Sequence, residues 1–226
     1  MDPCTRVRTA VTTLLRRCGL GAIAGAALAI LGNAFLFVVN PAVPDDRLSY
    51  PLSPQAYVPM QLFLALTQAL LAAGVVGLVC SDVVRPSRAA RILGGLAVVG
   101  MLLTVPGELV LILVRRAAGD ASSVGTASSV FGLGALLADI GLTGIGVIAL
   151  RQRRWPRPWA ALPLVLGIFQ LFVVTPVSIA FGFAGVASNV VIGIADVLTA
   201  LIGVAVIRLS SPAGQVSRTG ARSVDA

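Results

Sequence analysis

ADVLTALIGVAVIR, at residues 195–208, is an apolar run with one acid at its second position and one arginine at its end. The stretch ADIGLTGIGVIALR, at residues 138–151, has the same plan, and six of the fourteen positions are identical. In each copy the acid, Asp139 or Asp196, precedes the arginine by twelve residues, which is about 18 Å along a helix. The hydrocarbon core of a bilayer is about 30 Å thick, so both acids are predicted near the middle of membrane-spanning helices.

The composition places the whole chain among membrane proteins. Of its 226 residues, 57% are hydrophobic and 12% are charged, and the mean hydropathy is +0.96. Soluble domains carry about 25% charged residues. The apolar runs are long and continuous rather than alternating, which favours helices over a barrel. We therefore predict an all-α fold: a polytopic integral membrane protein with a bundle of six transmembrane helices.

Six apolar runs separated by polar loops define the domain organisation. Residues 1–18 are predicted to form a short amphipathic segment on the cytoplasmic surface, because Val7, Val11 and Leu14 follow a helical period. Residues 208–226, rich in Ser, Gly and Arg, are predicted to be a disordered cytoplasmic tail. The transmembrane domain covers residues 19–207, with spans at about 19–40, 57–80, 92–114, 128–150, 160–181 and 187–207.

The arginines predict the orientation of the spans. All seventeen basic residues are arginine, and fourteen of them lie in segments on the same side as the N-terminus. The other side holds Arg47, Arg115 and Arg116. Because basic loops stay in the cytoplasm, both termini are predicted to lie inside the cell.

The same arrangement bears on partners and location. Although the net charge is +8, the arginines lie between apolar runs, so the lipid bilayer is the expected partner and nucleic acid is not. The overall pattern looks like that of the many small six-span proteins of bacteria. We therefore expect a multi-pass protein of a cell membrane, the bacterial cytoplasmic membrane.

A second match relates the odd-numbered spans. GNAFLFVVNP at residues 32–41 and GIFQLFVVTP at residues 167–176 agree at six of ten positions. Together with the two spans that contain an aspartate, this match predicts three repeated helical hairpins in the same orientation: spans one–two, three–four and five–six. Apolar segments built from a few residue types often match by chance, so coincidence stays an alternative interpretation.

Six polar side chains inside the predicted spans form the candidate site. An acid at the centre of a membrane helix costs roughly 2.5–3.5 kcal/mol on insertion scales, so it is expected to face the interior of the bundle. Acids in such surroundings suit the handling of protons or cations. We predict an intramembrane polar centre built from Asp139, Asp196, Glu108, Gln68, Asn33 and Gln170.

These polar residues also have a structural interpretation. Each aspartate could make one hydrogen bond between helices, which is worth about 0.6 kcal/mol in a membrane protein. Glu108 lies seven residues before Arg115 on the same helical face, so an ion pair between them would explain the acid. Pro106 and Pro176 predict either helix breaks around a site or kinks near the outer ends of their spans, and the kink is the simpler interpretation.

Signatures of the common enzyme classes are missing from the sequence. There is no histidine, no C-x-x-C pair, no P-loop and no G-x-S-x-G motif. The three cysteines, Cys4, Cys18 and Cys80, are predicted on the cytoplasmic side as reduced structural residues. We therefore nominate no catalytic residue, no metal ligand and no cofactor, and we do not expect an enzyme.

Two functional hypotheses from different classes follow. The leading one is a transporter-like or channel-like protein whose interior acids handle protons, cations or a small solute. The alternative is a non-catalytic subunit, scaffold or regulator that packs against another membrane protein or a second copy of itself. Transport predicts that Asp139 and Asp196 face one polar cavity, whereas the alternative predicts a dry bundle. A membrane enzyme acting on lipid is a third and weaker hypothesis.

Overall fold

The computed structural model describes residues 3–81, 83–182 and 185–210, and over these residues the chain forms helices and no strand. The helices are α1 (Pro3–Val38), α2 (Pro54–Cys80), α3 (Arg88–Leu111), the 3₁₀ turn η1 (Ile112–Val114), α4 (Ser122–Gln152), α5 (Arg157–Phe169), the π-helix η2 (Gln170–Val174), α6 (Thr175–Phe181) and α7 (Val186–Ser210). The predicted all-α class is confirmed.

Six segments of this chain are long and apolar enough to cross a membrane. They are Thr9–Val38, Pro54–Cys80, Arg88–Val114, Ser122–Gln152, Arg157–Phe181 and Val186–Leu209. The fifth consists of α5, η2 and α6 in one continuous path, and we call it span five. The number of long apolar segments is therefore the number predicted from the sequence.

Helix α1 is a single helix of 36 residues. Residues 3–18, predicted as a separate surface segment, belong to the same helix as the predicted first span, and their position relative to a bilayer stays a prediction. Pro41 lies in the loop after α1, whereas Pro176 lies inside α6. The two prolines of the predicted repeat thus have different surroundings, and the repeat also stays a prediction. Most of the predicted tail, from residue 211 onward, lies outside the described residues.

Local sequence signals explain several helix ends. Ser53 precedes α2, and its hydroxyl accepts a hydrogen bond from the Ala56 N–H at 3.2 Å. Ser87 caps α3 in the same way, accepting from the Ala90 N–H at 3.1 Å. These side chains satisfy backbone donors that the first turn of a helix leaves without partners. At the end of α4, Arg153 adopts a left-handed conformation with φ of 51°, which terminates the helix.

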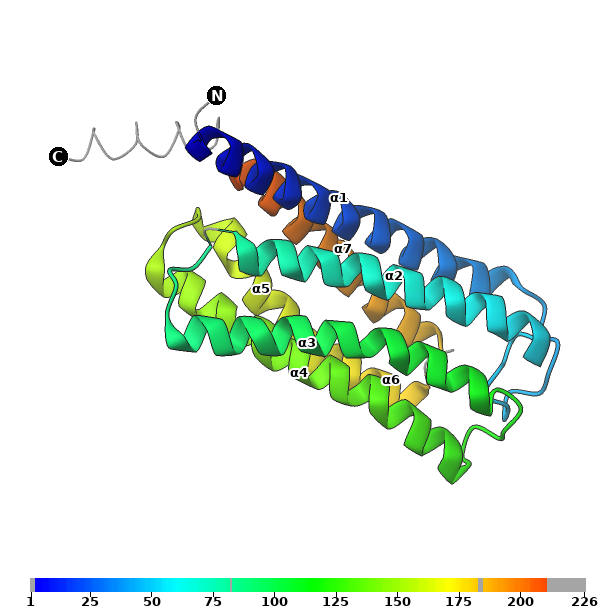
Figure 1. Ribbon diagram of the computed structural model, residues 1–226. Helices are drawn as coiled ribbons and strands as arrows, with labels where there is room; N and C mark the ends of the chain where they lie inside the picture. Colours follow the sequence, from blue (N-terminus) through cyan, green and yellow to red (C-terminus); the bar gives the residue numbers. More distant parts are fainter. Residues whose placement is uncertain (1–2, 82, 183–184, 211–226) are drawn as a thin grey trace.

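The helices lie roughly along one common direction and form a closed circuit (Figure 1). Each packs against the next in the order α1, α2, α3, α4, span five and α7, and α7 packs back against α1. The α3–α4 contact is the most extensive, and α2 also contacts α7 across the circuit. The start of α1 and the end of α7 therefore lie at the same end of the bundle (Figure 1).

Glycines bring α3 and α4 into backbone contact. A Cβ at Gly100 would collide with the backbone nitrogen of Ala138, and one at Gly107 would lie 2.7 Å from the Phe131 Cα. A Cβ at Gly141 would lie 2.6 Å from the Leu93 carbonyl oxygen. We call this contact the glycine seam. Small residues at helix contacts allow the backbones to approach this closely in membrane proteins.

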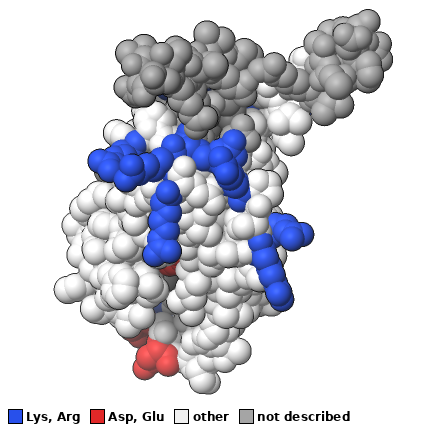
Figure 2. Space-filling model, turned by 90° about the vertical axis from the view of Figure 1, so that its left-hand side faces the viewer, with Lys and Arg blue, Asp and Glu red and all other residues white. Residues whose placement is uncertain are grey.

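Most of the arginines gather at one end of the bundle. Figure 2 shows them clustered on the face seen from the left-hand side of Figure 1. This end holds the loops after α2 and α4 as well as the first turns of α1 and the last turn of α7. The loop after α2 is joined there to the last residue of α4, because the Arg85 N–H donates to the Gln152 side-chain oxygen. We call this the arginine-rich end.

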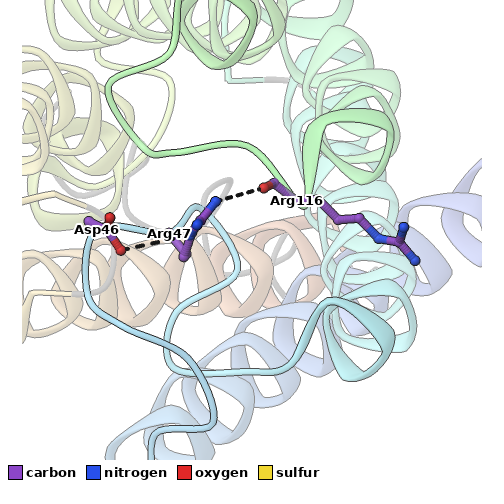
Figure 3. A network of polar contacts seen from close by, with 3 residues as sticks. All are labelled: Asp46, Arg47 and Arg116. Atoms are coloured by element: carbon purple, nitrogen blue, oxygen red, sulfur yellow. Dashed lines mark hydrogen bonds and ion pairs between the residues drawn. The ribbon is translucent and has the colours of Figure 1, made fainter.

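At the opposite end, the loop after α1 is docked on the loop after η1 (Figure 3). The Gly119 N–H donates to the Asp46 carbonyl at 2.7 Å, and the Leu48 N–H donates to the Ala117 carbonyl at 3.3 Å. The Arg47 guanidinium donates to the Arg116 carbonyl at 3.3 Å and lies 3.8 Å from the Asp46 carboxylate (Figure 3). Backbone pairing therefore connects the α1–α2 hairpin to the α3–α4 hairpin.

Candidate functional site

All three acids that were predicted inside the spans are buried. The exposed fraction is 4% for Asp139, 6% for Asp196 and 7% for Glu108. Gln68, Gln170 and Asn33 are half-buried. Charged side chains are rarely buried to this degree without a partner, so we describe the groups that surround each acid.

Glu108 has a hydrogen-bonding partner in a row of polar side chains between α2 and α3, which we call the polar strip. The Gln68 side chain of α2 hydrogen-bonds to the Glu108 carboxyl of α3. One turn away, the Thr104 hydroxyl lies 3.4 Å from the Gln68 side-chain oxygen and donates to the Met101 carbonyl at 2.7 Å. Gln68 therefore bridges two polar residues of the neighbouring helix, and of the six predicted site residues the structure brings this pair together.

The strip continues along α2 toward the end opposite the arginines. Gln61 donates to the Tyr57 hydroxyl, and both residues are buried. The remaining side-chain oxygen of Gln61 is buried without a hydrogen-bond partner among the described residues. Tyr57, Gln61 and Gln68 are spaced by four and seven residues, which places them on one face of the helix. That spacing was visible in the sequence, although neither Tyr57 nor Gln61 was nominated.

The ion pair between Glu108 and Arg115 that the sequence allowed is not formed among the described residues. The Arg115 guanidinium instead donates to the carbonyl of Ile112 in its own turn at 2.8 Å. Because η1 tightens the chain after α3, the seven-residue spacing no longer follows a regular α-helix. Glu108 is held by Gln68 across the helix contact instead.

Asp139 lies on the face of α4 that packs against span five. Seven residues later on the same face, a Cβ at Gly146 would lie 2.5 Å from the Leu164 Cβ of α5. The carbonyl oxygen of Asp139 is 2.8 Å from the position that a Cβ of Gly167 would take. Asp139 is therefore placed beside span five by two backbone contacts that only glycine permits.

Asp196 lies on the face of α7 that packs against α1. Gly203 is two turns further along this face, and a Cβ there would lie 2.6 Å from the Gly19 carbonyl oxygen and 3.0 Å from the Ala22 Cβ. The Oδ2 atom of Asp196 is buried and has no hydrogen-bond partner in the part of the chain that the structure describes. This carboxyl thus includes a buried acceptor that no described hydrogen bond satisfies.

The two aspartates belong to helices whose backbones are not adjacent. Over the described residues α5 and the π-helix η2 lie between α4 and α7 and contact both. No hydrogen bond joins Asp139 to Asp196 there. The predicted single polar centre therefore resolves into three places: the α2–α3 strip, Asp139 at the contact of α4 with span five, and Asp196 on the face of α7 that packs against α1.

The described residues offer few other groups that could bind a metal or react. Among them, no group of three or more His, Cys, Asp or Glu side chains could hold a metal ion. Cys18 and Cys80 are free thiols. A pocket of about 220 Å³ lies at the docked loops, lined by Arg47, Arg115, Arg116 and Ser49 among others, and none of the three buried acids lines it.

Comparison with known proteins gives no match: no protein-family model, no curated protein and no solved structure is significantly similar to this chain.

Proposed function

We propose that this chain is a multi-pass membrane protein that moves protons or monovalent cations across the bilayer by means of its buried carboxyl groups. The membrane location is supported by the six long apolar helices. It is also supported by large apolar side chains on their outer faces, such as Leu31, Leu113 and Ile179, which are 64%, 78% and 80% exposed. Soluble proteins rarely expose apolar surface so extensively, whereas lipid would cover it.

The proposed orientation of the chain in the membrane follows from the distribution of its charged residues. The arginine-rich end would face the cytoplasm, as in other membrane proteins whose basic loops remain inside (Figure 2). The docked loops would then face outward. Lipid headgroups on the cytoplasmic side are acidic, so they would attract the arginines of this end.

One observation carries the transport proposal: three carboxyl groups are buried in an apolar bundle, and none forms an ion pair among the described residues. A structural pair would bring an arginine close to each acid, as Arg47 is close to Asp46. Acids kept inside a membrane at this cost typically belong to ion or proton pathways. Asp139 and Asp196 would be the titrating or cation-binding groups, and Glu108 would stand on the route from the outside along the α2–α3 strip.

The test is flux through the purified protein in proteoliposomes. Imposed pH and sodium gradients, read by dyes inside the vesicles, should collapse faster with the parent chain than in empty vesicles. Asp139→Asn and Asp196→Asn should slow this collapse by at least tenfold. Asp120→Asn, which changes an exposed loop acid, should leave it unchanged. Equal rates for all four chains and for empty vesicles would refute the proposal.

A second candidate function, that of a subunit or scaffold, is favoured by one face of α4. Gly125, Ser129 and Gly132 follow one another on this face, all are exposed, and a Cβ at either glycine would meet nothing within 4 Å. Such small-residue faces suit close packing of another membrane helix. If Gly132→Leu dissociates a complex seen for the parent chain by native mass spectrometry while flux is absent, this second function replaces the first.

A further inference from the structure

The docked loops enclose the pocket of about 220 Å³ at the end opposite the arginine-rich end. One side of the pocket is formed by the loop after α1, including Pro44, Arg47 and Ser49, and the other by Arg115 and Arg116 after η1. Two backbone hydrogen bonds join these loops, as described above. The pocket therefore lies between two helical hairpins and is lined by residues of both.

Three arginines line the pocket, and they are the three that the sequence places on this side of the bundle. Basic residues are normally scarce in the outer loops of membrane proteins, so their position around one pocket has a local reason. Among the described residues, no acidic side chain lines the pocket. Its lining is therefore positively charged, and an anion is the kind of ligand that would balance it.

Two of the guanidinium groups keep N–H donors for such a ligand. Arg47 donates one N–H to the Arg116 carbonyl at 3.3 Å, and its Nε lies 3.8 Å from the exposed Asp46 carboxylate (Figure 3). Arg115 donates one N–H to the Ile112 carbonyl at 2.8 Å. A guanidinium has five N–H donors, so both side chains retain several. The Arg116 side chain extends away from Arg47 (Figure 3), and we assign it no direct contact with a ligand.

Ser49 is the most buried residue of the pocket lining. Its exposed fraction is 1%, and its hydroxyl is buried without a hydrogen-bond partner among the described residues. Buried polar groups nearly always have a partner, and an exception often indicates a bound water or ion. Pro44 and Arg47, by contrast, are exposed, so the pocket can be reached from outside. The lining thus combines accessible cationic donors with one buried hydroxyl that could also donate.

The position of the pocket indicates which anion is available. Arg115 directly follows the apolar segment Arg88–Val114, and Pro54, which also lines the pocket, begins the segment Pro54–Cys80. The pocket therefore lies where two of the proposed spans would leave the hydrocarbon layer, at the depth of the lipid headgroups. Phospholipid headgroups carry a phosphate there, and the planar fork of arginine matches the oxygens of a phosphate.

We propose that this pocket binds one phosphate group through the guanidinium groups of Arg47 and Arg115 and the hydroxyl of Ser49. The phosphate belongs either to a lipid headgroup of the outer leaflet or to a free phosphate ion, and the chemistry of recognition is the same. Pockets for drug-sized ligands measure about 300–1,000 Å³, so a pocket of about 220 Å³ suits a group of this size. The bound phosphate would join the two hairpins, and it has no part in the proposed transport.

Binding is measured by thermal unfolding of the purified, delipidated chain in a detergent that contains no phosphate. Sodium phosphate is compared with sodium chloride at equal ionic strength, and phosphatidylglycerol with monogalactosyldiacylglycerol, a lipid without phosphate, with the same acyl chains. A ligand at a hundred times its Kd should raise the melting temperature of a chain of this size by roughly 5–10 °C. A rise with phosphate ion identifies a solute site, a rise with phosphatidylglycerol alone identifies a headgroup site, and neither comparison compound should give it.

Three variants identify the site and one controls for it. Arg47→Gln and Arg115→Gln each remove one guanidinium and should at least halve the rise. Ser49→Ala should melt no lower than the parent chain without phosphate, because its hydroxyl has no partner to lose, but it should gain less from phosphate. A purely structural serine would not show this combination. Arg91→Gln changes an exposed arginine of α3 at the arginine-rich end and should keep the full rise.

Two results would overturn the site. One is the absence of a rise in the parent chain with both sources of phosphate. The other is an equal rise in the parent chain, Arg47→Gln and Arg115→Gln, which would show that phosphate acts at other arginines or as a stabilising salt. Because Arg47 is exposed, Arg47→Gln decides the matter even if Arg115→Gln fails to fold. Flux through vesicles is not part of this measurement, so the site and the proposed transport stand or fail separately.

Discussion

The contact between α3 and α4 and the contacts around span five occupy similar depths of the bundle, but they are built in opposite ways. At the glycine seam the two backbones touch through Gly100, Gly107 and Gly141, and no space is left for a side chain between them. Around span five a proline widens the helix, and buried polar atoms of Thr143 and Ser178 stay without partners among the described residues.

The difference shows that glycine and proline give two opposite kinds of contact between helices. Glycine in a helix permits the close approach of a second helix backbone. Proline removes a hydrogen bond and leaves a carbonyl to be satisfied by something else. The α3–α4 contact is therefore closed to side chains, whereas the span-five region contains buried polar side-chain atoms without partners among the described residues.

The largest effect is expected from filling the glycine seam. Gly100→Leu would drive a side chain into the backbone of α4, which cannot move aside locally, so the variant should lose about 3 kcal/mol or fail to fold. Thermal unfolding in detergent measures the loss. Gly95→Leu is the matched control, because it lies on the same helix, is exposed, and meets nothing within 4 Å. An equal loss in both variants would mean that the seam is not a rigid contact.

The next effect concerns the polar strip between α2 and α3. Gln68→Leu leaves the buried Glu108 carboxyl without its hydrogen-bond partner, which should cost about 1–3 kcal/mol. Gln55→Leu changes an exposed glutamine in the first turn of the same helix and should be nearly neutral. If both variants unfold at the temperature of the parent chain, the strip does not contribute to stability and its role must be sought in function.

A smaller effect is expected at the two buried aspartates, Asp139 and Asp196. Asn keeps the shape of Asp but carries no charge, so Asp139→Asn and Asp196→Asn should match the parent in stability or exceed it by up to about 1 kcal/mol. The melting temperatures in sodium-free buffer measure this. A loss of several degrees in either variant would show that the acid holds helices together, and would favour the subunit or scaffold function over transport.

The smallest effect is expected at the docked loops. The Asp46–Arg47 pair is exposed, so Asp46→Ala should change the free energy of unfolding by no more than about 0.5 kcal/mol. The backbone bonds of this contact do not depend on the Asp46 side chain. A melting curve that shifts by more than the measurement error would mean that the carboxylate does more than pair with Arg47.

Much of the architecture could be predicted because apolar run length alone decides it. Each predicted span corresponds to one long apolar helical segment, and most of the arginines that predict orientation gather at one end of the bundle (Figure 2). The burial of Asp139, Asp196 and Glu108 also follows from their position in such runs. These predictions depend on local composition, which needs no knowledge of how the helices are arranged.

The partners of the polar residues could not be predicted, because they depend on the register between helices. Nothing in the sequence around Glu108 shows that Gln68 lies opposite, and Arg115 was an equally good partner by spacing alone. Pro176 was predicted to break or kink its span, and the π turn that precedes it is a detail that the sequence did not reveal. Proline predicts a lost hydrogen bond, and the packing of α4 and α7 against span five determines how the chain accommodates it.

The contact between Gly19 and Gly203 joins α1 to α7, two helices that are far apart in the sequence. Every other neighbouring pair in the circuit of helices is consecutive along the chain, so this contact is the one that closes the circuit. A chain truncated before residue 186 could form the other contacts but would leave this face of α1 without its neighbour.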